Sequence, residues 1–211
     1  MIVDCLTNED EALAAAIDAI RAGELVVLPT DTVYGVGADA FSPKAVDKLL
    51  TAKGRGRDKP SPVLVASIED AEKLAVSIPP VARALMKEYW PGALTIILPA
   101  REEIGWDLGE TNGTVALRMP NNPIALELLR RTGPLAVSSA NLTARHPAAT
   151  VTQASDQLGE KIAVYLDGGE CGGGVPSTIV IVGDTLTIVR HGAIEAQDIA
   201  RFGTVESPSK N

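Results

Sequence analysis

The chain has 211 residues and a formal net charge of −8 at neutral pH, from 19 Lys and Arg against 27 Asp and Glu. Apolar residues make up 45%, which indicates a globular protein, and the acidic balance argues against a general nucleic-acid coat, which needs a positive surface. The longest apolar run, residues 93–100, is too short for a membrane helix and the N-terminus lacks a signal-peptide pattern, so we expect a cytoplasmic protein without membrane contact.

Helical and extended patterns alternate along the first half of the chain. Asn8 and Glu11 have the spacing of a capping box, and Gly23 is placed to end the helix that they begin. Ser42 followed by Pro43 is typical of the start of a second helix. Further helices are predicted at 68–76 and 79–89, and strands at 25–29, 63–66 and 94–98.

The second half continues the alternation. Strands are predicted at 115–119, 135–138, 162–166, 178–182 and 185–190, with helices after Asn122, after a Thr152 cap and over 193–202. About seven or eight strands in mixed order with the helices predict an α/β (α+β) fold with a mixed sheet. Since no linker or repeat divides the chain, we expect one domain over 1–203 and a mobile C-terminal tail at 204–211.

The metal-ligating residue types are sparse and far apart. Cys5 and Cys171 lie far apart in the sequence, and His146 and His191 are also remote from each other. A zinc site needs closer spacing of such residues, so the sequence predicts no metal held by protein ligands.

A polar segment follows the strand at 25–29, over residues 28–41. Its hydroxyl, carboxylate and phenol groups suit a small polar ligand, since ligands bind at strand ends in open α/β sheets: Thr30, Asp31, Thr32 and Tyr34. Gly35, Gly37 and Ala40 formally match a dinucleotide fingerprint, although the polar residues before them do not fit that motif. A glycine-rich packing turn is the third interpretation.

A basic loop at 53–60 is the densest positive cluster of this acidic chain. Its alternate residues Lys53, Arg55, Arg57 and Lys59 are all cationic. They could be a solvated helix end, where cations are favourable, or an open loop that neutralises a triphosphate. It is not a Walker loop, because the required Gly-Lys-Ser/Thr pattern is absent from the chain.

Other polar or cationic residues follow later strands. Arg118 stands in an apolar strand and needs an anionic partner, either a structural carboxylate or a bound anion. Ser138, Ser139 and Asn141 end another strand, where they cap a turn or hold a ligand. Residues 168–174 are rich in glycine, as in a hairpin loop or a lid, and Arg190 ends a strand. Together these clusters predict one anion-binding cleft.

Six motifs occur in order and make the chain resemble the threonylcarbamoyl-AMP synthase family, the YrdC-domain proteins, over about residues 17–202. They are PTDTVYGVGADAF, Lys53-Gly-Arg55, VALRMP, SSAN, VPSTIV and VRHGAI. The resemblance implies the short, single-domain type, with a twisted mixed sheet around a concave, positively charged cavity.

The implied activity is the synthesis of L-threonylcarbamoyladenylate from L-threonine, bicarbonate and ATP, with release of pyrophosphate. ATP is a substrate, accompanied by Mg²⁺, and no tightly bound cofactor is expected. The product supplies the group for N6-threonylcarbamoyladenosine at position 37 of tRNA. The implied partners are therefore the tRNA-modifying transferase machinery and, through a weak contact, RNA.

The resemblance also implies site residues. The catalytic set is Lys53, Arg55, Ser139 and Asn141, and the ATP-binding set adds Lys59, Thr114 and Arg190. The L-threonine-binding set is Thr32, Arg118, Val137 and Ser177. Three positions depart from the family pattern, because Lys59 stands at an Asn position, Leu64 at a His position and His191 at a position where Pro is common.

Two alternatives stay open from the sequence. One is a carbamoyl-transfer domain of the hydrogenase-maturation type, which shares the expected fold but sits in longer, cysteine-rich chains. The other is a non-enzymatic RNA-binding module, which the net charge of −8 disfavours.

Overall fold

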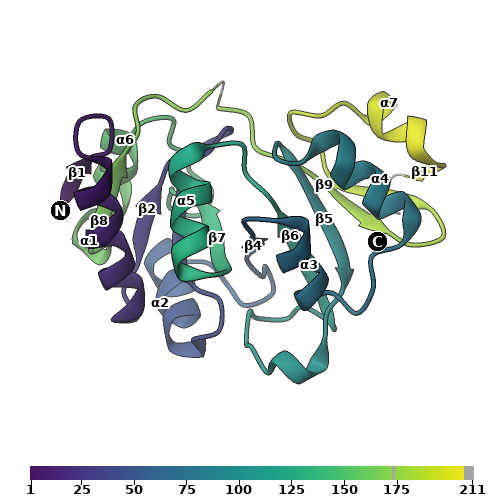
Figure 1. Ribbon diagram of the computed structural model, residues 1–211, viewed down its shortest axis with the longest axis horizontal. Coiled ribbons are helices and arrows are strands. Elements are labelled where there is room, and N and C mark those ends of the chain that lie inside the picture. Colours follow the sequence, from purple (N-terminus) through teal and green to yellow (C-terminus); the bar gives the residue numbers. More distant parts are fainter. Residues whose placement is uncertain (173, 207–211) are drawn as a thin grey trace.

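The computed structural model describes residues 1–172 and 174–206, which form one sheet with helices on both faces (Figure 1). The strands are β1 (Ile2–Asp4), β2 (Val26–Leu28), β3 (Gly35–Asp39), β4 (Val63–Leu64), β5 (Leu94–Pro99), β6 (Thr114–Arg118), β7 (Leu135–Ser139), β8 (Val164–Asp167), β9 (Thr178–Val182), β10 (Leu186–Arg190) and β11 (Val205–Glu206). The helices are α1 (Glu9–Arg21), α2 (Pro43–Lys53), α3 (Ile68–Leu74), α4 (Pro80–Tyr89), α5 (Pro123–Thr132), α6 (Val151–Leu158) and α7 (Ala196–Ile199).

The sheet contains eleven strands in the order β1-β8-β2-β3-β7-β4-β6-β5-β9-β10-β11. The sheet is mixed: some neighbours are parallel (β1 with β8, β4 with β6, β5 with β9) and others are antiparallel (β2 with β3, β3 with β7, β5 with β6). The predicted α/β class with a twisted mixed sheet is confirmed, but the number of strands among the described residues exceeds the predicted seven or eight.

Three strands were missed because they lack a hydrophobic run. β1 and β11 are very short edge strands, and β3 is largely glycine and alanine. Val205 and Glu206, which we expected in a mobile tail, instead pair with β10. Residues 207–211 of that tail lie outside the described residues.

The helix starts follow the capping chemistry in most places. The side chains of Ser42 and Asn122 accept hydrogen bonds from backbone N–H groups three residues on, as expected for N-caps. Asn8 makes no such bond and contacts the Glu11 carboxylate instead, so the predicted capping box is not formed. Helix α6 is capped by Thr150, two residues before the predicted cap.

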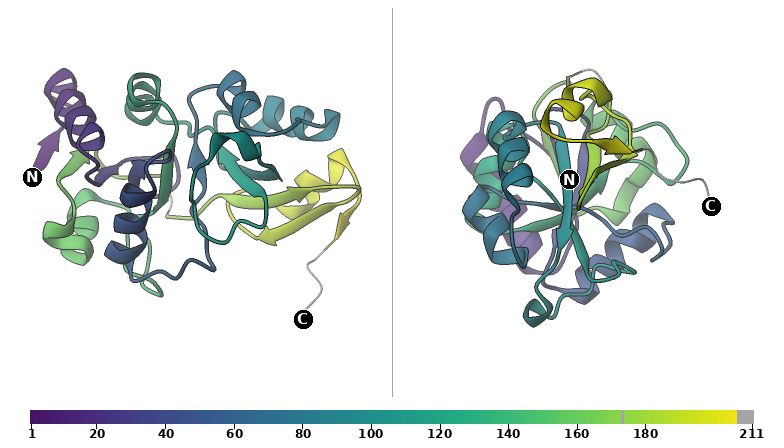
Figure 2. Two further views of the ribbon diagram at one scale, coloured as in Figure 1. Left: turned by 90° about the horizontal axis from the view of Figure 1, so that it is seen from below. Right: turned by 90° about the vertical axis from the view of Figure 1, so that its right-hand side faces the viewer.

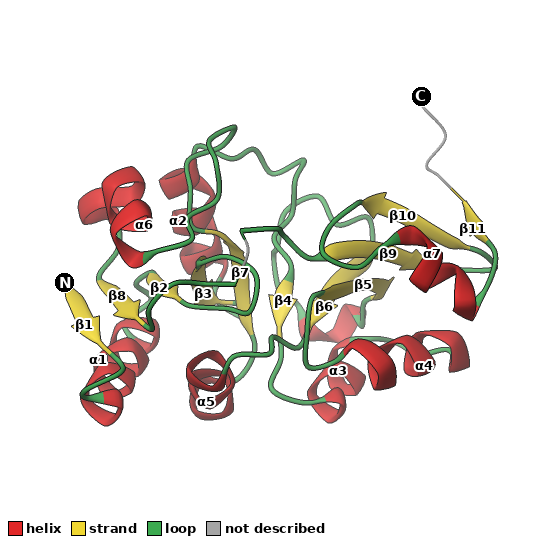
Figure 3. Cartoon of the chain, turned by 90° about the horizontal axis from the view of Figure 1, so that it is seen from above, coloured by secondary structure: helices red, strands yellow, loops and turns green. Residues whose placement is uncertain are grey.

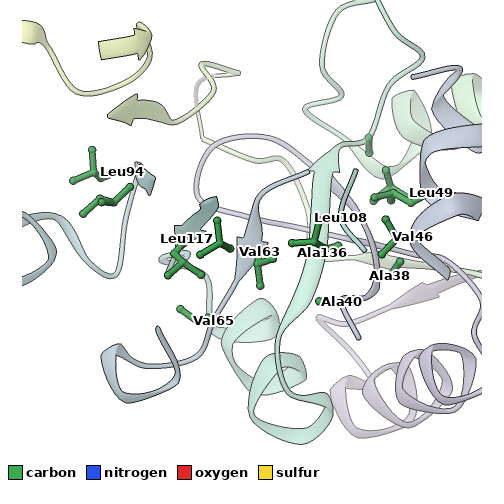
Figure 4. Close-up of a cluster of buried hydrophobic side chains, with 14 of the residues drawn as sticks. Ala38, Ala40, Val46, Leu49, Val63, Val65, Leu94, Leu108, Leu117 and Ala136 are labelled. Carbon is green, nitrogen blue, oxygen red and sulfur yellow. The ribbon is translucent and has the colours of Figure 1, made fainter. Parts of the chain in front are cut away.

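The central strands are buried on both faces, which explains their continuous apolar runs. Val27, Ala136 and Tyr165 belong to one hydrophobic cluster, whereas their chain neighbours on the same strands belong to the other. Helices α2 and α6 cover one face of this half of the sheet, and α1 and α5 cover the opposite face (Figure 3). The larger cluster runs from Leu49 of α2 past Ala136 and Val63 to Leu94 (Figure 4).

The sheet extends along the long axis of the molecule, with the N-terminus at one end and β11 at the other (Figure 2). None of the helices in the described part of the chain combines the length and apolar character needed to span a bilayer.

Candidate active site

A cavity of about 290 Å³ opens among the central strands β3, β7, β6, β5 and β9. Eight residues that the sequence predicted for the site line it: Thr32, Arg55, Thr114, Arg118, Val137, Ser139, Ser177 and Arg190. They come from segments far apart in the sequence, so the fold brings together most of the predicted set. Lys53, Lys59 and Asn141 do not line the cavity.

Strand periodicity selects the residues that face this cavity. Thr95 and Ile97 of β5 line it, whereas Ile96 between them is fully buried in the core. On β6, Thr114, Ala116 and Arg118 line the cavity and Leu117 lies in the core, although the buried Val115 also reaches the cavity wall. Because successive side chains of a strand point to opposite faces, one face of these strands builds the core and the other builds the site.

Arg118 is buried and bound by three partners. Its Nη2 donates to Asp31 Oδ1 at 2.6 Å, its Nη1 to Thr32 Oγ1 at 3.0 Å, and its Nε to the carbonyl oxygen of Gly92 at 2.9 Å. Asp31 also accepts from the backbone N–H of Asn121. Burial lowers the pKa of Arg118, and Asp31 opposes that shift. Of the two partners considered for Arg118, the structural carboxylate is therefore present, and the ion pair holds the guanidinium at the cavity wall.

Arg55 reaches the cavity from the loop after α2. Its Nη1 donates to Ser138 Oγ at 3.0 Å, while Nε and Nη2 bind the carbonyl oxygens of Lys59 and Pro60. The guanidinium thus closes its own loop and ties it to the end of β7. The side chain of Lys59 is exposed, and only its carbonyl takes part.

Arg190 lies beside Ser177 at the other side of the cavity. Its Nε and Nη2 donate to the Ser177 carbonyl oxygen at 3.0 and 2.7 Å, and Nη2 donates to Ser177 Oγ at 2.9 Å. The register of β10 against β9 shifts between Ile188 and Arg190. Such a bulge redirects side chains, which explains why both Val189 and Arg190 line the cavity.

The three arginines make the cavity positive within an acidic protein. Arg190 is solvent-accessible through the open cavity, yet protein atoms surround its guanidinium; this burial, together with Arg118 and Arg55, lowers its pKa to about 10. Like charges shift each other in this way only when they are close. In the described part of the chain, Arg118 alone of the three pairs with a carboxylate, so two cations are left to an anionic ligand.

Lys53 and Asn141 lie behind the cavity wall. The Lys53 ammonium is buried and donates to the carbonyl oxygens of Ser139 and Asn141, the latter at 2.6 Å. Asn141 Nδ2 binds the carbonyl oxygens of Leu142 and Arg145. Both side chains therefore shape the loop that follows β7.

A model of the Sua5/YciO/YrdC family, which carries the description "Telomere recombination", matches residues 18–192. The chain belongs to this family. The resemblance inferred from the six motifs is thereby confirmed.

Named relatives agree with the Sua5/YciO/YrdC assignment. A Mycobacterium tuberculosis protein, provisionally named threonylcarbamoyl-AMP synthase, is 48% identical over 98% of this chain and 96% of its own length. The Bacillus subtilis threonylcarbamoyl-AMP synthase is 40% identical over 94% of this chain but only 58% of its own length. Pyrococcus abyssi Sua5, solved with L-threonine, is 33% identical with a TM-score of 0.89, and the match covers 98% of this chain and 62% of that chain.

Sequence reasoning missed several residues of this Sua5/YciO/YrdC cavity. Ser61, Thr95, Leu108 and Thr111 line it, but none stands in the six motifs. The β5 segment LTIILP reads as a core strand, and its single polar residue is the one signal that marks Thr95. Gly35 and Gly37 lie inside β3, so the dinucleotide-fingerprint interpretation is wrong. A Cβ at Gly35 would come within 2.6 Å of Val137 Cγ1, which makes the motif a packing device.

Gly192, just after β10, lets the chain pass close to the backbone of Pro176 and Ser177 at the cavity wall. A Cβ at this position would overlap the backbone of Pro176 and Ser177. We expect Gly192→Ala to lower the free energy of unfolding by about 1–3 kcal/mol, since overpacking against backbone forces it to shift. Gly183→Ala is the matched control in the β9–β10 hairpin, because its Cβ would meet only Thr185 O at 3.8 Å. Urea denaturation of both variants measures the difference, and equal stabilities would contradict the prediction.

Proposed function

We propose that the chain is a threonylcarbamoyl-AMP synthase, a nucleotidyltransferase that uses L-threonine, bicarbonate and ATP. The observation that carries the proposal is the cluster of Arg55, Arg118 and Arg190 around one small cavity in an acidic chain. Relatives of this name at 40–48% identity support it. A site of this size and charge suits a nucleotide and an amino acid better than a length of RNA.

L-Threonine binds on the Arg118 side of the cavity in this proposal. A guanidinium carries five N–H donors, and Gly92, Thr32 and Asp31 occupy three of them. The remaining two are free for the carboxylate of the amino acid. Thr32 lies beside them, and Val137 and Ser177 complete this end of the cavity. Leu64 also lines the cavity, so an apolar side chain stands where many family members carry His.

The phosphates of ATP bind toward Arg55 and Arg190, with Thr114 and Ser139 as neutral hydrogen-bonding groups. In the proposed roles, Lys53 acts from behind the wall by holding the carbonyl oxygens of Ser139 and Asn141. Asn141 acts there by holding the carbonyl oxygens of Leu142 and Arg145. Lys59 contributes its carbonyl oxygen to the position of Arg55. Its exposed side chain contacts ATP from outside the cavity lining in this proposal.

The reaction proceeds by addition and then displacement. The threonine amine nitrogen adds to bicarbonate with loss of water, which gives N-carboxythreonine. An oxygen of that new carboxylate attacks the α-phosphorus of ATP, and the bond to pyrophosphate breaks. Charge spreads over the phosphoryl oxygens as this happens, so the preorganised guanidinium groups stabilise the transition state more than the ground state.

Mg²⁺ accompanies the ATP phosphates in this proposal. Among residues 1–172 and 174–206 there is no group of three or more His, Cys, Asp or Glu that fits a metal ion. The nearby Asp31 is occupied by Arg118. The protein side chains therefore do not fit a resident magnesium site.

The product is an activated acyl-adenylate, which must pass to a transferase that modifies tRNA. We propose that RNA contact by this chain is weak, since the positive charge is concentrated in the cavity. The two alternative functions fit the relatives less well. Salt-titrated RNA binding tests the RNA-binding alternative, because a true RNA-binding module shows a steep salt dependence.

Pyrophosphate release tests the proposal directly. The chain is incubated with ATP, bicarbonate and L-threonine, and parallel reactions omit bicarbonate or replace threonine by valine. We expect release that requires both threonine and bicarbonate, with carbon from labelled bicarbonate in the adenylate. Release that is indifferent to the amino acid contradicts the proposal.

The lowered pKa of Lys53 predicts that the rate of this reaction depends on pH. Burial, with help from Arg55, lowers the pKa of Lys53 to about 8. We expect the rate to fall as pH rises through about 8, because the neutral amine holds the Ser139 and Asn141 carbonyl oxygens less strongly. Between this pKa and the ordinary lysine value, the unfolded chain binds more protons than the folded one, so this group increases stability as pH rises.

The lowered pKa of Lys53 therefore has opposite effects on activity and on stability as the pH rises. Activity should drop above pH 8 while the melting temperature does not drop on account of Lys53. A Lys53→Arg variant keeps its charge over this range, so its pH–rate profile should lack the fall. A profile unchanged from that of the parent chain contradicts the prediction, and the melting temperature shows whether the larger side chain is accommodated.

A further inference from the structure

A pair of buried hydroxyl groups lies in the wall of the cavity. Thr95 of β5 is 1% exposed and Ser177, just before β9, is 4% exposed. Their hydroxyl oxygens are 2.8 Å apart, which is a hydrogen bond between two strands that pair in parallel. Ser177 belongs to the predicted site, whereas no motif singled out Thr95.

Thr95 is the polar residue in an otherwise aliphatic strand. Leu94 and Ile96 on either side of it are fully buried in the core. Valine has nearly the same shape, and burying a hydroxyl costs free energy unless it forms a hydrogen bond. Packing does not require the Thr95 hydroxyl, so the hydrogen bond to Ser177 is the interaction that explains why this position carries a threonine.

Ser177 connects Thr95 to Arg190. The Arg190 guanidinium has only donors, and its Nη2 donates to Ser177 Oγ at 2.9 Å. The Ser177 oxygen is therefore an acceptor toward Arg190. The hydrogen bond between Ser177 and Thr95 uses the hydrogen of one of their two hydroxyl groups. Thr95, Ser177 and Arg190 form a continuous chain of hydrogen bonds across β5, β9 and β10.

The pair holds one more hydrogen than it uses. Two hydroxyl hydrogens are present and one forms the Thr95–Ser177 bond; within residues 1–172 and 174–206 neither oxygen donates to another protein atom. Both residues line the cavity. Whichever hydroxyl donates to the other, the second hydrogen is available to an acceptor atom in the cavity.

We propose that Thr95 is a positioning residue for the reaction, which acts through Ser177 on Arg190 and directs one hydroxyl donor toward an anionic oxygen of the bound substrates. The inference rests on the proposed function and adds a residue to it. Without Thr95, Ser177 loses the partner that fixes its rotamer, and Arg190 loses a fixed acceptor beside its other bonds to the Ser177 carbonyl. Cooperative chains of this kind weaken as a whole when one member is removed.

The test measures both turnover and affinity for inorganic pyrophosphate, using the full chain. We expect Thr95→Val to lower kcat and pyrophosphate affinity about tenfold each, and Thr95→Ser to stay within about twofold of the parent chain, since it keeps the hydroxyl. Thr187→Val is the matched control, because Thr187 is a strand threonine of β10 outside the cavity. Melting temperatures establish that all variants are folded.

A double-mutant cycle tests the route through Ser177. In a Ser177→Ala background, Thr95→Val should change pyrophosphate affinity by less than about twofold, because the acceptor through which it acts is gone. A tenfold loss in both backgrounds, or parental behaviour of Thr95→Val, overturns the proposal. If the parent chain binds pyrophosphate but shows no threonine-dependent release, the proposed function fails while the binding measurements still decide the role of Thr95. A parent chain that binds no pyrophosphate overturns the inference as well.

Discussion

Arg55→Ala is expected to lower the rate of threonine-dependent pyrophosphate release by about a hundredfold or more while the fold is retained. The guanidinium lines the cavity and contacts Ser138, and among the described residues no carboxylate forms an ion pair with it. Removal of one preorganised charge-stabilising group typically costs two to three orders of magnitude in kcat. Steady-state kinetics with ATP in excess, together with the melting temperature, measure the effect.

Arg57 provides the matched control in the same loop. Its guanidinium is 45% exposed and pairs with Asp107, away from the cavity. Exposed ion pairs contribute little to stability, and Arg57 does not line the cavity. Arg57→Ala should therefore leave turnover within about twofold of the parent chain. If the two arginine variants are impaired equally, the assigned role of Arg55 is wrong and the loop as a whole carries the effect.

Asp31→Ala is expected to lower the free energy of unfolding by about 3–5 kcal/mol and to weaken L-threonine binding. Asp31 and Arg118 have side chains only 16% and 8% exposed, and the carboxylate also holds the backbone N–H of Asn121. Loss of one partner of a buried pair leaves the other charge buried without compensation. Urea denaturation and calorimetric titration with L-threonine measure the two effects.

The Lys48–Glu24 pair is the comparison for this effect. Both side chains are 47% exposed, so Glu24→Ala should cost less than about 1 kcal/mol. A similarly small loss for Asp31→Ala would show that solvent reaches Arg118 and would remove the structural argument for its role in carboxylate binding.

The fold class and most element positions could be predicted because local chemistry determines them. Ser42-Pro43 and Asn122-Pro123 begin helices where N-caps require them, and continuous aliphatic runs become strands buried on both faces. β3 could not be predicted in this way. Its residues GVGAD have little strand propensity, and they are extended because β2 and β7 pair with them on either side.

The site could be predicted where a residue type is anomalous for its surroundings. Arg118 in an apolar strand and the basic loop around Arg55 are such cases, and both line the cavity. Nearness in the sequence did not predict which side chains reach the cavity. Lys53 is two residues from Arg55 but lies behind the cavity wall, because it belongs to the last turn of α2. Thr95 was missed because its role depends on a hydrogen bond to Ser177. The pairing of β5 with β9 brings these two residues together, although they are far apart in the sequence.

The pairing of β1 with β8 and of β5 with β9 has a consequence for how the chain folds. Ile2 finds its partner Tyr165, and Thr95 its neighbour Ile179, only after most of the polypeptide has been synthesised. Contacts of such large sequence separation slow folding, and they leave unfinished sheet edges exposed meanwhile. A nascent chain that stops before β9 presents the aliphatic strand β5 as an open edge, which favours aggregation. We therefore expect this protein to depend on chaperones during translation more than a helical protein of equal length.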